Sequence, residues 1–168
     1  MNRFHELLKE GKEMRFLRES GLPLRLNLRI GEEDAGMLSF DGSMMDAEFS
    51  GHDRSFSIRK ERKTLKTIVR DGVRESASCS EQKLGTLVIL TEDSNILFLK
   101  NEGFWDGCTS LIEYETGCWF LKFFPEKIAG QTSIRVEVSP VFIDADDLLE
   151  LSALSVFELV RDERELRK

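Results

Sequence analysis

The side chains with the clearest chemical potential are the basic residues of segment 54–70. This segment holds seven basic residues and one acid, Glu61, so its net charge is +6, whereas the whole chain has a formal net charge of -7. Each Lys or Arg close to an anionic membrane contributes about 1 kcal/mol of attraction. We therefore predict an anion- or lipid-binding site formed by Arg59, Lys60, Arg62, Lys63 and Lys66.

The same segment also fits a plain hairpin with a charged outer face. Phe56 and Ile58 alternate with Ser57 and Arg59, which is the pattern of a strand with one buried face. The basic residues would then be solvated side chains without a ligand, and this alternative stays open.

Three aspartates, Asp144, Asp146 and Asp147, form a second cluster. Hard cations take several carboxylate oxygens, but the glycine and terminal glutamate of an EF-hand loop are missing here. Asp is favoured at the amino-terminal cap and first turn of a helix, where it meets the positive end of the helix dipole. We therefore interpret the cluster as a helix start and predict no metal site.

Catalytic groups are scarce. His5 and His52 are the two histidines of the chain, and neither lies in a metal-binding spacing or beside a nucleophile motif. Cys79 lies between serines without a neighbouring base that would activate its thiol. The sequence predicts a protein that is not an enzyme and has no cofactor.

Charge and hydropathy indicate the compartment and the partners. The formal charge of -7 argues against nucleic-acid binding, and three cysteines without paired spacing indicate a reducing compartment. The longest apolar stretch, residues 148–160, is shorter than the roughly 20 residues of a membrane span, and no signal-peptide pattern is present. We expect a cytoplasmic protein without a transmembrane segment, whose partner is an anionic membrane surface or another protein; the oligomeric state stays open.

The elements that must position these residues are mostly strands. A length of 168 residues suits a single domain, 1–168. Residues 1–20 have near-helical apolar spacing, which predicts a short amphipathic amino-terminal helix. From Leu22 to Ile30 every second residue is apolar, which predicts a strand. Alternating segments separated by turn residues continue through 22–143. The predicted strands are 22–30, 37–40, 44–49, 55–60, 65–70, 84–90, 96–100, 109–114, 118–124 and 134–138, with weaker ones at 74–79 and 141–143.

Residues 144–168 differ from the rest. Asp144 is expected to cap a helix whose apolar residues cover almost its whole circumference, so the helix must be buried on most sides before a charged tail begins. Glu150 and Glu158 would then mark its least buried face. The 12 Phe, spread over strands and helix, are expected to be core packing.

An antiparallel meander followed by one buried terminal helix resembles the tubby carboxy-terminal-like superfamily, which includes tubby proteins, phospholipid scramblases and LURP-one-related proteins. Residues 98–105 (FLKNEGFW) and 114–119 (YETGCW) are similar to a recurring unit of that family. The resemblance implies a mainly β fold, a closed barrel of about twelve antiparallel strands around a central hydrophobic helix. It also implies a non-enzymatic binding or interaction module, in line with phosphoinositide binding by tubby proteins.

Two other functions fit the same residues. A small acidic chaperone or adaptor that binds a protein partner is the main alternative. A carrier of a small ligand would need a hollow barrel, whereas the terminal helix is expected to fill it.

Overall fold

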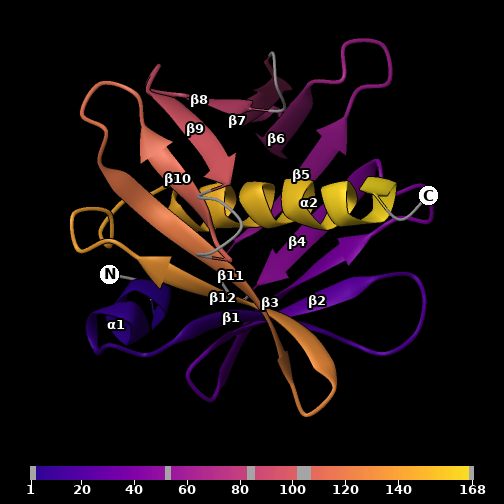
Figure 1. The fold of residues 1–168 in the computed structure, drawn as a ribbon, viewed down its shortest axis with the longest axis vertical. Helices are drawn as coiled ribbons and strands as arrows, with labels where there is room; N and C mark the ends of the chain where they lie inside the picture. The colour runs from indigo at the N-terminus through magenta and orange to yellow at the C-terminus, as the bar shows by residue number, and fades with distance from the viewer. Residues whose placement is uncertain (1–2, 52–53, 83–85, 102–106, 167–168) are drawn as a thin grey trace.

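Twelve antiparallel strands form a closed barrel in the computed structural model, which describes residues 3–51, 54–82, 86–101 and 107–166 (Figure 1). Each strand pairs with the next in the chain, and the first strand pairs with the last. The predicted fold class is confirmed. The strands are β1 (Met14–Arg18), β2 (Arg25–Ile30), β3 (Glu33–Phe40), β4 (Asp46–Gly51), β5 (Ser55–Lys60), β6 (Thr67–Asp71), β7 (Arg74–Glu81), β8 (Leu87–Thr91), β9 (Ile96–Asn101), β10 (Thr109–Glu113), β11 (Trp119–Ile128) and β12 (Gln131–Val138).

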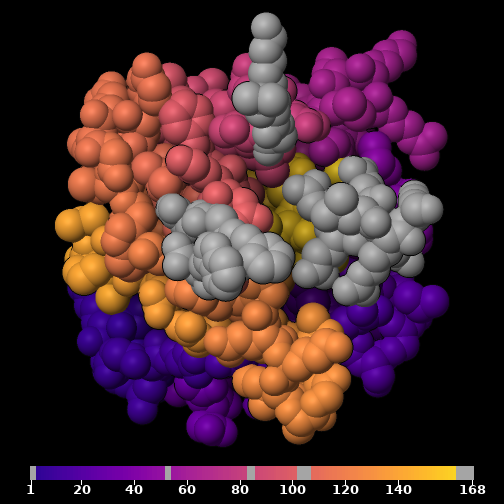
Figure 2. Space-filling view, viewed as in Figure 1, coloured from indigo at the N-terminus to yellow at the C-terminus, as the bar shows by residue number. Residues whose placement is uncertain are grey.

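Helix α2 (Leu148–Leu166) runs through the interior of this barrel. All eleven residues from Leu148 to Glu158 are buried, so this part of the helix has no solvent-facing side. Figure 1 shows α2, in yellow, crossing the middle of the molecule, and Figure 2 shows only a small part of it among the surrounding atoms. The helix is therefore a core element, as its all-round apolar sequence predicts.

Phenylalanines fill much of the space between helix and wall. Phe16, Phe49, Phe123 and Phe157 are among the largest fully buried side chains. Phe157 of α2 stacks on Phe40 of β3 with 5.5 Å between ring centroids. The expectation that Phe serves as core packing is confirmed for these residues.

The amino-terminal prediction is wrong in its second half. Helix α1 (Arg3–Lys9) is short, and Gly11 has a positive φ of 79°. The chain then enters β1, where Met14 and Phe16 point inward. Pairing with both β2 and β12 satisfies the backbone of this segment and closes the barrel, which a helix over residues 1–20 could not do.

The start of α2 also differs from the prediction. Residues 141–144 form turns rather than a strand, and the helix begins at Leu148, with the Asp147 carbonyl accepting the first helical bond from Leu151 N–H at 2.9 Å. Asp144 does not cap the helix; it pairs with Lys9 of α1 at 2.7 Å. The charged residues 161–166 continue the helix instead of forming a separate tail.

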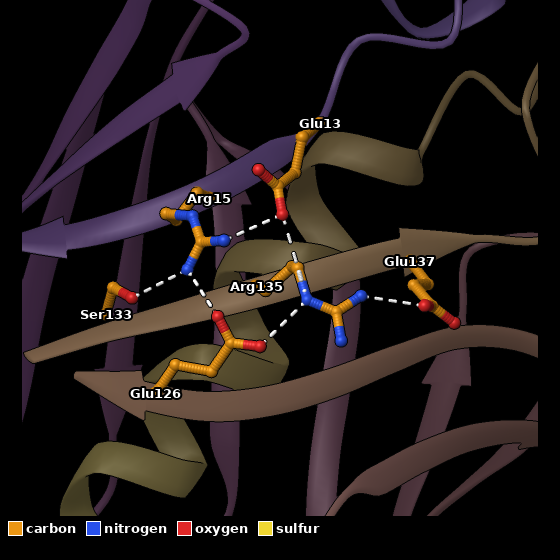
Figure 3. A network of polar contacts seen from close by, with 6 residues as sticks. All are labelled: Glu13, Arg15, Glu126, Ser133, Arg135 and Glu137. Atoms are coloured by element: carbon orange, nitrogen blue, oxygen red, sulfur yellow. Dashed lines mark hydrogen bonds and ion pairs between the residues drawn. The ribbon is translucent and has the colours of Figure 1, made fainter. Parts of the chain in front are cut away.

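A charged network crosses the seam where β1 meets β12 (Figure 3). Glu126 of β11 accepts hydrogen bonds from Arg15 of β1 at 2.7 Å and from Arg135 of β12 at 2.9 Å. Arg135 also pairs with Glu137 at 2.7 Å, and its guanidinium lies 4.2 Å from the centroid of the Phe124 ring. The hydrogen bonds from Arg15 and Arg135 lower the pKa of Glu126 below its ordinary value.

Helix burial predicts the effect of changing Leu154, whose side chain is fully buried. Leu154→Ala should lower the free energy of unfolding by about 2–5 kcal/mol. Leu154→Asp should abolish soluble expression, because it places a charge inside the barrel. Chemical denaturation measures the first effect, with Leu90→Ala on the outer face as the control. Equal unfolding curves for Leu154→Ala and the parent protein would contradict an enclosed helix.

The seam network predicts a pH-dependent loss in Glu126→Gln. A carboxylate whose pKa is lowered by folding stabilises the fold above its unfolded pKa of about 4.3, and that stabilisation disappears as pH falls through the folded pKa. Thermal unfolding should therefore show a lower Tm for Glu126→Gln at pH 7 and a shrinking difference toward pH 3. Glu48→Gln, on exposed β4 surface, is the matched control. A difference that persists unchanged at pH 3 would refute the ionic origin.

Candidate functional site

The structure does not gather the five predicted anion-binding residues on one face. Arg59 pairs with Asp46 at 3.0 Å on the outside of the barrel, whereas its neighbour Lys60 approaches Glu158 of α2 at 3.5 Å. Lys66 lies 4.0 Å from Glu75. Successive residues of a strand point to opposite faces, so one basic run supplies both outer and inner partners.

The remaining two predicted residues, Arg62 and Lys63, lie exposed in the turn between β5 and β6. Within the described residues no acidic side chain pairs with either of them. This turn is at the end of the barrel where Lys60 meets Glu158, toward the carboxy-terminal part of α2.

Helix α2 carries two carboxylates inside the barrel, and both Glu150 and Glu158 are only 1% exposed. The expectation that they mark the least buried face of the helix is wrong. Buried carboxylates need charged or hydrogen-bonding partners, and here one cation precedes β5 and another ends it. Glu158 pairs with Lys60 and accepts a hydrogen bond from Thr67, while Glu150 pairs with Arg54.

The Lys60–Glu158 pair predicts a structural role for Lys60. Lys60→Met leaves Glu158 buried without its cation and should lower the free energy of unfolding by about 3–5 kcal/mol. Lys63→Met, three residues away in the exposed turn, should change it by no more than about 0.5 kcal/mol. Urea denaturation of both variants checks this contrast. Equal stability of the two variants would show that the ion pair of Lys60 with Glu158 does not stabilise the fold.

The second pair, Arg54 with Glu150, lies beside a cleft, which both residues line. Arg54 ion-pairs with Glu150 Oε1 and donates from Nη1 to the Asp146 carbonyl at 2.9 Å. Among the described residues, Glu150 Oε2 has no hydrogen-bond partner. Burial raises the pKa of Glu150, and the charge of Arg54 opposes that rise. A buried carboxylate oxygen without a partner is unusual in a folded protein.

The cleft, which we name the acidic cleft, has a volume of about 470 Å³ and lies where α2 begins. Its walls come from the strand ends around that opening of the barrel. Its charged lining residues are the bases Arg54 and Arg74 and the acids Glu92, Asp93, Glu113, Asp146, Asp147 and Glu150. Six acids against two bases give the lining a net charge of -4.

Four of these acids lack a basic partner in the part of the chain that the structure describes. Arg74 pairs with Glu92 and Arg54 with Glu150, which leaves Asp93, Glu113, Asp146 and Asp147. Burial raises the pKa of Asp147, and the neighbouring negative charges of Asp93 and Asp146 raise it further. The fold thus holds carboxylates in mutual repulsion, an arrangement that a bound cation would relieve.

Aromatic rings add an apolar wall to the acidic cleft. Phe120 and Phe142 both line it, stacked with 4.5 Å between centroids and 6° between planes. An ammonium or guanidinium group gains from carboxylates and from aromatic faces, and its aliphatic stem gains from apolar contact. The chemistry of the cleft therefore suits an organic cation. For comparison, no group of three or more His, Cys, Asp or Glu in the described residues could hold a metal ion.

Sequence reasoning missed this site, although it singled out parts of it. Asp146 and Asp147 were expected only to start a helix, and Arg54 was counted with a basic run. The lining residues come from six separate segments of the chain, and only the barrel register brings them together. His52 and residues 102–105 of the family-like stretch lie outside the described residues.

Comparison with known proteins returned no match to a family model, a curated protein or a solved structure. Neither helix of the described chain is long and apolar enough to cross a membrane.

Proposed function

We propose that this protein is a non-enzymatic binding module with a tubby-like barrel, and that its acidic cleft holds the cationic group of a partner. The resemblance in layout supports the tubby-like assignment: a closed barrel of twelve antiparallel strands encloses a carboxy-terminal helix. The acidic cleft supports the binding role, because it combines a net negative lining with an aromatic wall.

A single observation carries the proposal. Glu150 is 1% exposed, lines the acidic cleft, and has a carboxylate oxygen without a hydrogen-bond partner among the described residues. A buried, incompletely paired carboxylate costs free energy. Proteins retain such groups at sites where a ligand completes the pairing, as perturbed carboxylates in a cleft indicate.

The enclosed helix narrows the choice of function. Because α2 fills the barrel, a ligand of the hollow-carrier kind would have to displace core side chains. A ligand at the end of the barrel needs no such rearrangement. An adaptor that binds a basic region of another protein fits this geometry. A binding module and an adaptor, the two functions expected from the sequence, are then the same function.

Binding of a pentalysine peptide tests the proposal by isothermal titration calorimetry. The parent protein should bind pentalysine, and the double variant Glu113→Gln with Asp147→Asn should bind it about tenfold more weakly, since each lost carboxylate removes about 0.7 kcal/mol at a partly exposed site. The double variant Glu48→Gln with Glu137→Gln removes the same charge from exposed strand positions away from the acidic cleft and should retain binding.

Three results would oppose this function. They are no heat of binding with pentalysine at low salt, equal loss in both double variants, and equal binding of a fully acetylated peptide that carries no side-chain charge.

A second candidate is binding of anionic lipid headgroups through the turn between β5 and β6. Exposure of Arg62 and Lys63 without acidic partners in the described structure favours it. The other predicted residues have acidic partners at 3.0–4.0 Å, which reduces the charge available to a membrane.

Liposome flotation tests this second candidate. Vesicles with anionic lipid should carry the protein upward, neutral vesicles should not, and Arg62→Glu with Lys63→Glu should abolish flotation. Lys12→Glu with Lys127→Glu is a control with the same change of charge at exposed positions. Flotation that is equal with neutral vesicles, or equal in both charge-reversed variants, would exclude a specific headgroup site.

A further inference from the structure

An exposed apolar patch lies on the outer face of the barrel at the same end as the acidic cleft. We name it the rim patch and define it by Leu90, Ile96 and Tyr114, which are 47%, 40% and 60% exposed. Leu90 and Ile96 are direct partners across β8 and β9, and Tyr114 N–H donates to the Ile96 carbonyl at 2.9 Å. The ring of Phe98 meets Tyr114 edge-on at 5.4 Å between centroids, which extends the apolar surface along β9.

The rim patch is continuous with the acidic cleft. Each of its residues is adjacent in the chain to a residue that lines the cleft, namely Thr91, Asn95 and Glu113. Because neighbouring residues of an extended chain point to opposite faces, the same three stretches carry polar lining inside and apolar side chains outside. A partner that extends from the cleft over the rim would contact both surfaces.

Arg54 shows which kind of group Glu150 and the Asp146 carbonyl accept. Its side chain is 30% exposed, and its guanidinium contacts Glu150 and the Asp146 carbonyl. Glu150 and Asp147 both line the acidic cleft, and the second oxygen of Glu150 has no hydrogen-bond partner among the described residues. A second guanidinium or ammonium group would find acceptors of the same kind there.

We infer that the partner of the acidic cleft is a basic amphipathic segment of another protein, with a Lys or Arg in the cleft and apolar side chains on the rim patch. The inference rests on the proposed function and specifies its partner. Charge complementarity favours a basic segment, since the lining carries a net charge of -4. An anionic membrane would be repelled by that lining. A second copy that inserted its own basic turn would make a head-to-tail contact, which generates a ring where the rotation closes and an open chain of molecules where it does not.

Two model peptides of equal charge test the inference by fluorescence anisotropy at low and at moderate salt. They are Lys-Leu-Lys-Phe-Lys and Lys-Ser-Lys-Ser-Lys, each labelled with the same fluorophore at its amino end and amidated at its carboxyl end. The apolar peptide should bind at least about tenfold more tightly, which corresponds to roughly 55 Å² of additional buried apolar surface at about 25 cal/mol/Å².

Variants separate the two surfaces. Leu90→Ser with Tyr114→Ser should remove the advantage of the apolar peptide and leave the serine peptide unaffected. Glu113→Gln with Asp147→Asn should weaken both peptides. Ile128→Ser, an equally exposed apolar position at the far end of β11, is the control and should change neither affinity. Circular dichroism checks that each variant is folded.

The outcomes distinguish failure of the inference from failure of the proposed function. If both peptides bind with equal affinity and the acidic-cleft variant still weakens both, the inference of an amphipathic partner is wrong. The proposed function, a module that binds a cationic group, then stands. No cleft-dependent binding of either peptide overturns both. Concentration-dependent self-association that disappears in Leu90→Ser with Tyr114→Ser assigns the rim patch to a second copy and also overturns the inference.

Discussion

A helix enclosed by a closed sheet has no solvent-facing side, so every polar group on it must find a partner inside the barrel. This constraint applies to α2 from Leu148 to Glu158. Ser152 and Ser155 meet it locally by donating to carbonyls one turn back, each at 2.7 Å. The two glutamates cannot do so; their partners are Arg54, which directly precedes β5, and Lys60, which ends it. The basic run along β5 is thus partly a structural requirement of the buried helix.

The two buried pairs are not equivalent. Glu158 has Lys60 and Thr67 as partners, so both of its oxygens are engaged. Glu150, which lines the acidic cleft, pairs through one oxygen with Arg54, and its other oxygen has no hydrogen-bond partner among the described residues. The positive end of the α2 dipole faces this opening and favours the negative charge of Asp146, Asp147 and Glu150. Burial nevertheless raises the pKa of Asp147, and repulsion from Asp93 and Asp146 raises it further, so a bound cation would favour the charged form of Asp147.

Local patterns predicted much of the fold. The alternation from Leu22 to Ile30 predicted β2, and the apolar circumference of residues 148–160 predicted an enclosed helix. Local patterns failed where long-range pairing decides the structure. Residues 14–18 fit a helical spacing, yet they form β1 because the barrel can close only through a strand at that edge.

The candidate site was less predictable for the same reason. Arg59 and Lys60 are neighbours in sequence, but the strand directs one to Asp46 outside and the other to Glu158 inside. Glu113 and Asp147 are distant in sequence, but the register brings both to the acidic cleft. A charge count along the chain detects the first pair as a cluster and cannot detect the second. The side-chain direction that decides function follows from the closed topology.

The central claim is that buried carboxylates at the start of α2 form a site for an organic cation. Carbon-13 NMR titration of the Glu150 and Asp147 carboxyl groups, with and without pentalysine, tests it most directly. The account predicts that both pKa values lie above the ordinary range in the free protein, because burial disfavours the charged forms, and that the peptide lowers them, because a bound cation favours those forms. Ordinary pKa values in the free protein, or values that saturating peptide leaves unchanged, would contradict it.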